Sequence, residues 1–259
     1  MSERGRSALK RQGLSRAGAQ ASSKAKVEVQ PGEFGEEAPQ EGRAEVAYRY
    51  LRNAILANEL PAGFQAAENE IAAQLGMSRT PVHEAMARLQ DEGFVQILPR
   101  KGILVRALTP ADLLEIYDVL IAIEGAAAEL LAEEADGPRS STLDELQAST
   151  DAMASALRVS DLETWRIADE QFHDALVARC GNGRIKRMAA TVSGQSHRAR
   201  RLTLHLRPLP TNSTAEHQAI IDAIRSGDAA AAGDAARAHR RNARGQLVPI
   251  LKRINFHQL

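Results

Sequence analysis

The 259-residue chain contains one cysteine, Cys180, and only 3% of its residues are aromatic. A single cysteine excludes an internal disulfide and a zinc site built from several thiolates, and it is typical of a reducing compartment. No apolar run approaches the roughly 20 residues that a membrane-spanning helix needs. The first residues are polar and basic and lack the apolar segment of a secretory signal. The sequence therefore predicts a cytoplasmic protein that has no membrane partner.

An excess of charge of one sign is also missing, since 33 lysines and arginines balance 33 aspartates and glutamates. This balance excludes a generic polycationic binder of nucleic acid, but it hides local imbalances. Residues 112–174 carry 16 acidic and 3 basic side chains, whereas residues 175–215 carry 8 basic side chains and no acidic one. Selective DNA binding through a few well-placed cations is still compatible with these numbers.

The hydrophobic pattern divides the chain into four segments. Residues 1–42 are rich in small polar and charged residues and predict a disordered tail. Residues 43–108 combine three helical segments with a two-stranded β-hairpin, which is the order of a winged helix-turn-helix. Residues 109–252 show only helical periodicity and predict an antiparallel bundle of about six helices, followed by a C-terminal tail at 253–259. The predicted fold class is therefore mainly α.

The segment from Glu70 to Met86 has the parts of a helix-turn-helix. Ser78 is placed to cap the second helix, whose first exposed side chains would face base edges in the major groove. Arg79 can offer a bidentate fork to guanine, and Thr80 can contact a phosphate or a thymine methyl group. His83, one turn further on, can contact a base edge or a phosphate. The sequence therefore predicts binding to double-stranded DNA.

Leu75 to Ala85 resembles the signature L-G-x-S-R-T-P-V-R-E-A of the GntR family of bacterial transcription regulators, and it departs from that signature only at His83, where the family usually has arginine. The resemblance implies a homodimer that binds an operator of two-fold symmetry, most often as a repressor. The resemblance also implies DNA contacts at the start of the second helix of the helix-turn-helix, at the tip of the wing and in the first, supporting helix. In the supporting helix, the family often has arginine at the position that is asparagine here. The residues at these positions are Asn69, Ser78, Arg79, Arg100, Lys101 and Gly102.

One carboxylate and three imidazoles fall on the apolar faces of three helices in the predicted bundle. Asp169 and His173 lie one turn apart on the third helix, His217 precedes an isoleucine-rich face on the fifth, and His239 lies on an alanine-rich face of the last. A buried aspartate is costly unless it is paired or bound to metal. Three imidazoles and one carboxylate suit a divalent metal ion, zinc before nickel or manganese.

The segment from Asp169 to His173, the segment from Glu216 to Ile221 and the late His239 resemble the FCD branch of the GntR family. In that branch, the aspartate and three histidines hold a metal ion, and a small organic acid completes its coordination. The branch usually has an arginine that binds the acid's carboxylate four residues before the glutamate of the first bundle helix. Leu120 occupies this position, four residues before Glu124.

Since Leu120 cannot bind a carboxylate, another side chain has to do so unless the effector is less acidic than usual or absent. The helix predicted from Gly183 to Leu206 is a candidate source. An inward face set by Ile185, Met188, Val192, Ala199 and Leu202 would place two polar residues inside and one arginine near the edge. These predicted effector ligands are Gln195, Ser196 and Arg198. As an alternative to a role in binding the effector, the arginines at 198, 200 and 201 can form a solvent-exposed face of this helix, and this is the preferred interpretation.

Three functions are compatible with the sequence. The favoured one is a regulator that is not an enzyme, in which metal and effector modulate DNA binding. A metal-dependent hydrolase is the second, because one aspartate and three histidines can hold a metal ion that activates water, although no further motif supplies a general base. The third is a regulator whose bundle only dimerises and binds no metal.

Overall fold

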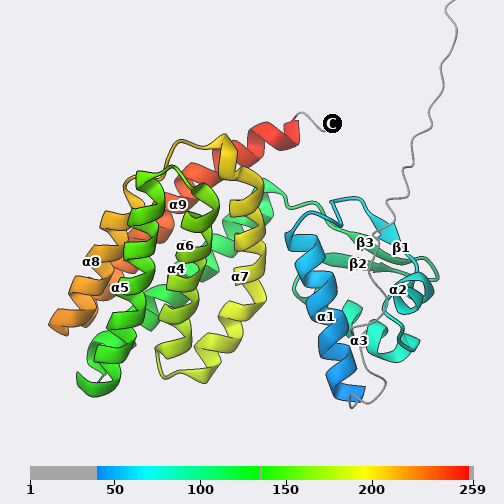
Figure 1. Cartoon of the computed structure of the whole chain (residues 1–259), viewed down its shortest axis with the longest axis horizontal. Helices are drawn as coiled ribbons and strands as arrows, with labels where there is room; N and C mark the ends of the chain where they lie inside the picture. Colours follow the sequence, from blue (N-terminus) through cyan, green and yellow to red (C-terminus); the bar gives the residue numbers. More distant parts are fainter. Residues whose placement is uncertain (1–39, 135, 257–259) are drawn as a thin grey trace, which may run out of the picture. The chain divides into compact units, whose positions relative to one another are not determined.

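The computed structural model describes residues 40–134 and 136–256 (Figure 1). The tail predicted at 1–42 lies outside the described residues as far as position 39, and residues 40–42, predicted to belong to it, form the start of the first helix. Within the described ranges the chain forms nine α-helices, one short 3-10 helix and one three-stranded sheet, which confirms the mainly α class. The elements are α1 (Gln40–Leu56), β1 (Gln65–Ala66), α2 (Glu68–Gln74), α3 (Arg79–Asp91), β2 (Val95–Leu98), β3 (Gly102–Val105), α4 (Pro110–Glu133), α5 (Asp136–Arg158), α6 (Leu162–Arg179), α7 (Gly183–Thr203), η1 (Leu204–Leu206), α8 (Ser213–Ser226) and α9 (Ala229–Phe256).

The first compact part, from α1 to β3, is the predicted winged helix-turn-helix. Gly76 has a φ of 61° and ends α2 in the left-handed conformation that glycine adopts at low cost. Ser78 has the extended backbone of an N-cap residue before α3, although its hydroxyl makes no capping hydrogen bond. Val82, Met86 and Leu89 of α3 are buried in the core of this part.

The sheet differs from the predicted two-stranded hairpin. The short strand β1 pairs antiparallel with β3, so the strand order is β1-β3-β2. Gly102 makes this approach feasible: its φ is 88°, and a Cβ atom there would lie 2.0 Å from the carbonyl oxygen of Ala66. A strand of two residues has no periodicity that a sequence pattern could reveal.

The second compact part consists of α4 to α9, and these six helices confirm the predicted bundle for the residues that the structure describes. Helix α4 packs along α9, α5 along α6, and α8 along α9 (Figure 1). Thr109 begins α4 with a capping box, in which its hydroxyl accepts from the N–H of Asp112 and the Asp112 carboxylate accepts from the N–H of Thr109. Helix α9 continues to Phe256, beyond the predicted end at 252.

The predicted inward face of α7 is partly wrong. Met188 and Leu202 were expected inside, but they are 57% and 37% exposed. Arg198 and Arg200, interpreted as solvated cations, are buried with 3% and 2% exposure. The buried face of this helix is polar because acceptors on other elements satisfy its cations, which a pattern within one helix cannot show.

No helix in the described ranges combines the length and the apolar character that crossing a membrane requires.

Candidate functional site

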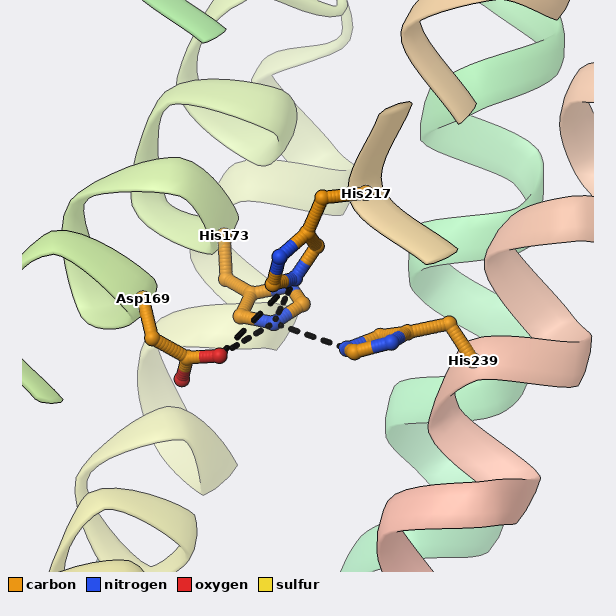
Figure 2. Close-up of side chains that lie close together, drawn as sticks. All are labelled: Asp169, His173, His217 and His239. Carbon is orange, nitrogen blue, oxygen red and sulfur yellow. Dashed lines mark hydrogen bonds and ion pairs between the residues drawn. The ribbon is translucent and has the colours of Figure 1, made fainter. Parts of the chain in front are cut away.

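The four predicted metal ligands meet inside the bundle (Figure 2). Asp169 and His173 come from α6, His217 from α8 and His239 from α9. All four side chains are buried, and one ligand atom from each lies within 4.8 Å of the others. The Nε2 atom of His173 lies 3.4 Å from Nε2 of His217 and 3.3 Å from Nε2 of His239. Asp169 Oδ1 is 3.8 Å from Nε2 of both His173 and His217.

Two glutamates fix the orientation of two of these imidazoles from outside the cluster. Nδ1 of His173 lies 3.0 Å from Oε2 of Glu124, and Nδ1 of His239 lies 2.7 Å from Oε2 of Glu216. An ionised carboxylate can only accept, so each Nδ1 carries the hydrogen and each Nε2 directs a lone pair at the other imidazoles. Carboxylates in this position orient histidine ligands and increase their basicity in known metal sites.

Burial is the main reason why the cluster favours neutral imidazoles. It lowers the pKa of His173, lowers the pKa of His217 well below its usual value, and lowers that of His239 to about 4 in spite of the Glu216 hydrogen bond. Burial alone would raise the pKa of Glu124, but the charge of Arg240 and the hydrogen bonds from Arg240 and His173 bring it below its usual value. Neutral imidazoles next to ionised carboxylates are the donor set that a divalent cation needs.

Two buried arginines complete the surroundings of the cluster. Arg240 on α9 donates to both carboxylate oxygens of Glu124, with Nε at 2.6 Å from Oε2. Arg200 on α7 donates to Oδ2 of Asp169 and leaves Oδ1 directed at the histidines. Roles for Arg240 and Glu216 were not predicted from the sequence, and Arg200 was predicted to lie in solvent. For the pair of Arg200 with Asp169, the acid-rich segment at 112–174 followed by the acid-free basic segment at 175–215 is a matching signal in the sequence, whereas Arg240 and Glu216 lie outside both segments.

A cavity of about 340 Å³ adjoins the cluster. Its lining includes two members of the cluster, Asp169 and His239, together with two arginines, Arg200 and Arg207. The other lining residues come from α6, α8, α9 and the η1–α8 connection, and are Trp165, Pro208, Leu209, Pro210, Thr211, Asn212, Ser213, Glu216, Ala243 and Gln246.

The three predicted effector ligands do not line this cavity in the part of the chain that the structure describes. The Gln195 amide donates to the carbonyl oxygen of Glu92 at 3.2 Å, and the Arg198 guanidinium donates to that of Arg106 at 2.8 Å. Ser196 is buried with 1% exposure. Leu120 also lies away from the cavity, since it is fully buried in an apolar cluster with Tyr117 and other core residues.

The predicted DNA-contacting residues lie at three exposed places of the winged helix. The start of α3 exposes Ser78, Arg79, Thr80 and His83, α2 exposes Asn69, and the β2–β3 turn exposes Arg100 and Lys101. Glu68 at the start of α2 was not predicted to take part in this surface. Its Oε1 lies 3.2 Å from Nε of Arg79, and its Oε2 lies 3.4 Å from Nδ1 of His83. One carboxylate therefore contacts both residues assigned to base recognition.

Comparison with known proteins separates the same two parts. Residues 43–105 match the model of bacterial regulatory proteins of the gntR family, and residues 115–242 match the FCD domain. An HTH-type transcriptional regulator of Agrobacterium vitis is 55% identical over 56% of this chain and 84% of that protein. A second HTH-type regulator, from Streptomyces ambofaciens, is 35% identical over 75% of this chain and 80% of its own length. The gluconate operon transcriptional repressor of Bacillus subtilis is 31% identical over 51% of this chain and 52% of that repressor.

Solved structures share the fold at lower identity. A GntR regulator from Rhodococcus sp. RHA1 has a TM-score of 0.64 and 24% identity, and it covers 80% of this chain and 98% of that one. The McbR/YncC protein of E. coli has a TM-score of 0.66 and 19% identity over 82% of this chain and 98% of that one. The family match sets aside the hydrolase alternative. The chain belongs to the GntR family of DNA-binding transcription regulators, in the branch that carries an FCD domain.

Proposed function

We propose that this regulator binds a divalent metal ion through Asp169, His173, His217 and His239, and that a small organic acid in the adjoining cavity modulates its binding to an operator. The observation that carries the proposal is the convergence of three imidazole Nε2 atoms, two of them 3.3 Å apart, while carboxylates engage the Nδ1 atoms of His173 and His239. Neutral Nε2 lone pairs at this distance repel one another, and a cation between them removes the repulsion.

Nitrogen ligands with one carboxylate favour zinc, with nickel or manganese as alternatives. The ion, when bound, would supply a Lewis acid that attracts a carboxylate. The chain itself holds the ligands ready for it. Glu124 and Glu216 orient two imidazoles, and Arg200 engages Oδ2 of Asp169 while Oδ1 remains directed at the cluster.

Helix α7 offers a physical connection between the cavity and the DNA-binding part. Arg200 contacts the metal ligand Asp169, whereas Gln195 and Arg198 on the same helix donate to backbone carbonyls of Glu92 and Arg106. An effector changes DNA affinity only if it binds the DNA-competent and incompetent arrangements unequally. A small shift of α7 on effector binding would change both sets of hydrogen bonds. We propose a homodimeric repressor, in keeping with the named repressor among the relatives.

Elemental analysis tests the metal proposal directly. Protein purified without a histidine tag and dialysed against trace zinc should contain close to one metal ion per chain, because four buried ligands converge on one point. His217→Ala removes an inward Nε2 and should reduce the metal content to background. His205→Ala is the matched control, since His205 is exposed on η1. Equal metal content in all three proteins, or none in the unaltered chain, would contradict the proposal.

Operator binding tests the proposed role of the α3 start. Glu68→Gln removes the carboxylate that contacts Arg79 and His83, so both side chains become free for DNA and affinity should rise by up to about fivefold, in line with about 0.2–1 kcal/mol for an exposed pair. Fluorescence anisotropy with duplexes selected by the unaltered protein measures the change across salt concentrations. Glu45→Gln, which breaks the exposed pair of Glu45 with Arg88, serves as the control and should leave affinity unchanged. An unaltered affinity in Glu68→Gln would argue against base recognition by Arg79 and His83.

A further inference from the structure

Arg207 differs from the other arginines that line or surround the cavity because it lacks an acidic partner. Its Nε and Nη2 atoms are buried without a hydrogen-bond partner, and none of the ion pairs found among the described residues includes it. The guanidinium carbon lies 4.9 Å from the centre of the Trp165 ring, whose Nε1 donates to Ser213 Oγ at 3.2 Å. Two buried guanidinium nitrogens without partners are costly, so the fold keeps the half-buried Arg207 at a position where a ligand in the cavity can satisfy them.

The charges around the cavity do not cancel once a divalent ion is bound. Arg200 neutralises Asp169, and Arg240 neutralises Glu124. Glu216 contributes one negative charge beside His239, whereas Arg207 and the divalent ion contribute positive charge. The surplus corresponds to about two positive charges, which matches a ligand with two ionised acidic groups.

The size of the cavity restricts the ligand further. Its volume of about 340 Å³ is at the lower end of the roughly 300–1,000 Å³ of ligand pockets. Trp165, Pro208 and Leu209 supply apolar surface beside the arginine, which suits a short carbon chain between two charged ends.

We propose that the effector is a short-chain dicarboxylate, with one carboxylate at the metal centre and the second held by Arg207. This inference rests on the proposed metal and acid binding and adds a second anchor to it. Arg207 thereby supplies the carboxylate contact that the apolar, fully buried Leu120 cannot make. A guanidinium suits this contact because its planar fork donates two parallel hydrogen bonds to one carboxylate.

Isothermal titration calorimetry on the untagged, zinc-loaded full chain tests the second anchor. The probes are three dicarboxylates and monocarboxylates of matched length: succinate with butyrate, malate with 3-hydroxybutyrate, and 2-oxoglutarate with 2-oxopentanoate. At least one dicarboxylate should bind about tenfold or more tightly than its partner acid, as expected for a buried charge-assisted contact. Arg207→Gln should remove this advantage and leave the monocarboxylate affinity and the zinc content unchanged.

Two variants show whether the loss comes from the guanidinium itself. Arg207→Lys keeps the charge without the fork and should retain part of the dicarboxylate advantage. Arg201→Gln, on the exposed side of α7, should bind both acids as the unaltered chain does. Equal weakening of both acids in Arg207→Gln would overturn the second anchor. Zinc binding without binding of any acid would overturn the ligand class alone, whereas absence of zinc would overturn the metal proposal as well.

Discussion

Replacing Glu124 with alanine is expected to lower the free energy of unfolding by about 3–5 kcal/mol, the cost of leaving a buried charge without its partner. Arg240 is 2% exposed and donates to both oxygens of Glu124. Its Nη1 atom is buried and has no hydrogen-bond partner in the described structure, so removal of Glu124 leaves the guanidinium without compensation. Urea unfolding followed by circular dichroism measures this change.

The same substitution should weaken metal binding for a separate reason. Glu124 accepts from Nδ1 of His173 at 3.0 Å, and loss of such an orienting carboxylate typically weakens metal affinity about 10–100-fold. The double variant Glu124→Leu with Arg240→Met separates the two effects. It removes both buried charges and should recover most of the stability, because apolar replacements of a buried pair are often neutral. Its zinc affinity, measured by competition with a chromophoric chelator, should remain reduced.

Glu129→Ala provides the control on the same helix. Glu129 pairs with Arg237 at 2.5 Å, but their side chains are 36% and 26% exposed, so the expected loss is at most about 1 kcal/mol. If Glu124→Ala lost no more stability than Glu129→Ala, the buried pair of Glu124 with Arg240 would contribute no more to stability than an exposed pair.

The cluster of Asp169, His173, His217 and His239 could be located from the sequence because its four side chains follow the apolar phase of their own helices. Phe172 and Leu176 define the buried face of α6, and Asp169 and His173 lie on it. Ile220 and Ile224 do the same for His217 on α8. Periodicity within one helix fixes which side chains point inward, and a bundle brings inward side chains together at its centre.

The polar surroundings of the cluster could not be found in this way. Arg200 and Arg240 are buried through partners on α6 and α4, and such pairing between helices distant in sequence leaves no periodic pattern. The face of α7 was misassigned for the same reason, since apolar Met188 is exposed while charged Arg198 is buried. Arginine and lysine side chains are usually exposed to solvent. Burial of an arginine can therefore be predicted only when the acceptors that pair with it are known.

Removing the metal ion is expected to lower the melting temperature by roughly 10 °C compared with protein in saturating zinc. A ligand that binds only the folded state at about 1,000 times its dissociation constant stabilises it by about 4 kcal/mol, and each kcal/mol corresponds to about 2–4 °C in a chain of this size. The structural reason is local: the Nε2 atom of His173 lies 3.4 Å from Nε2 of His217 and 3.3 Å from Nε2 of His239, and a cation between these atoms removes the repulsion of their lone pairs. Calorimetric scans with zinc and with a chelator measure the difference.

The histidine variants assign this stabilisation to the cluster. His205→Ala should retain the full zinc-dependent shift, because His205 is exposed and lies outside the cluster. His217→Ala should lose nearly all of it, since three remaining ligands hold zinc more weakly and the altered one is completely buried. A shift of equal size in both variants would mean that zinc binds elsewhere on the folded chain. Because the shift grows with the logarithm of free zinc concentration, a titration also yields the affinity of the site.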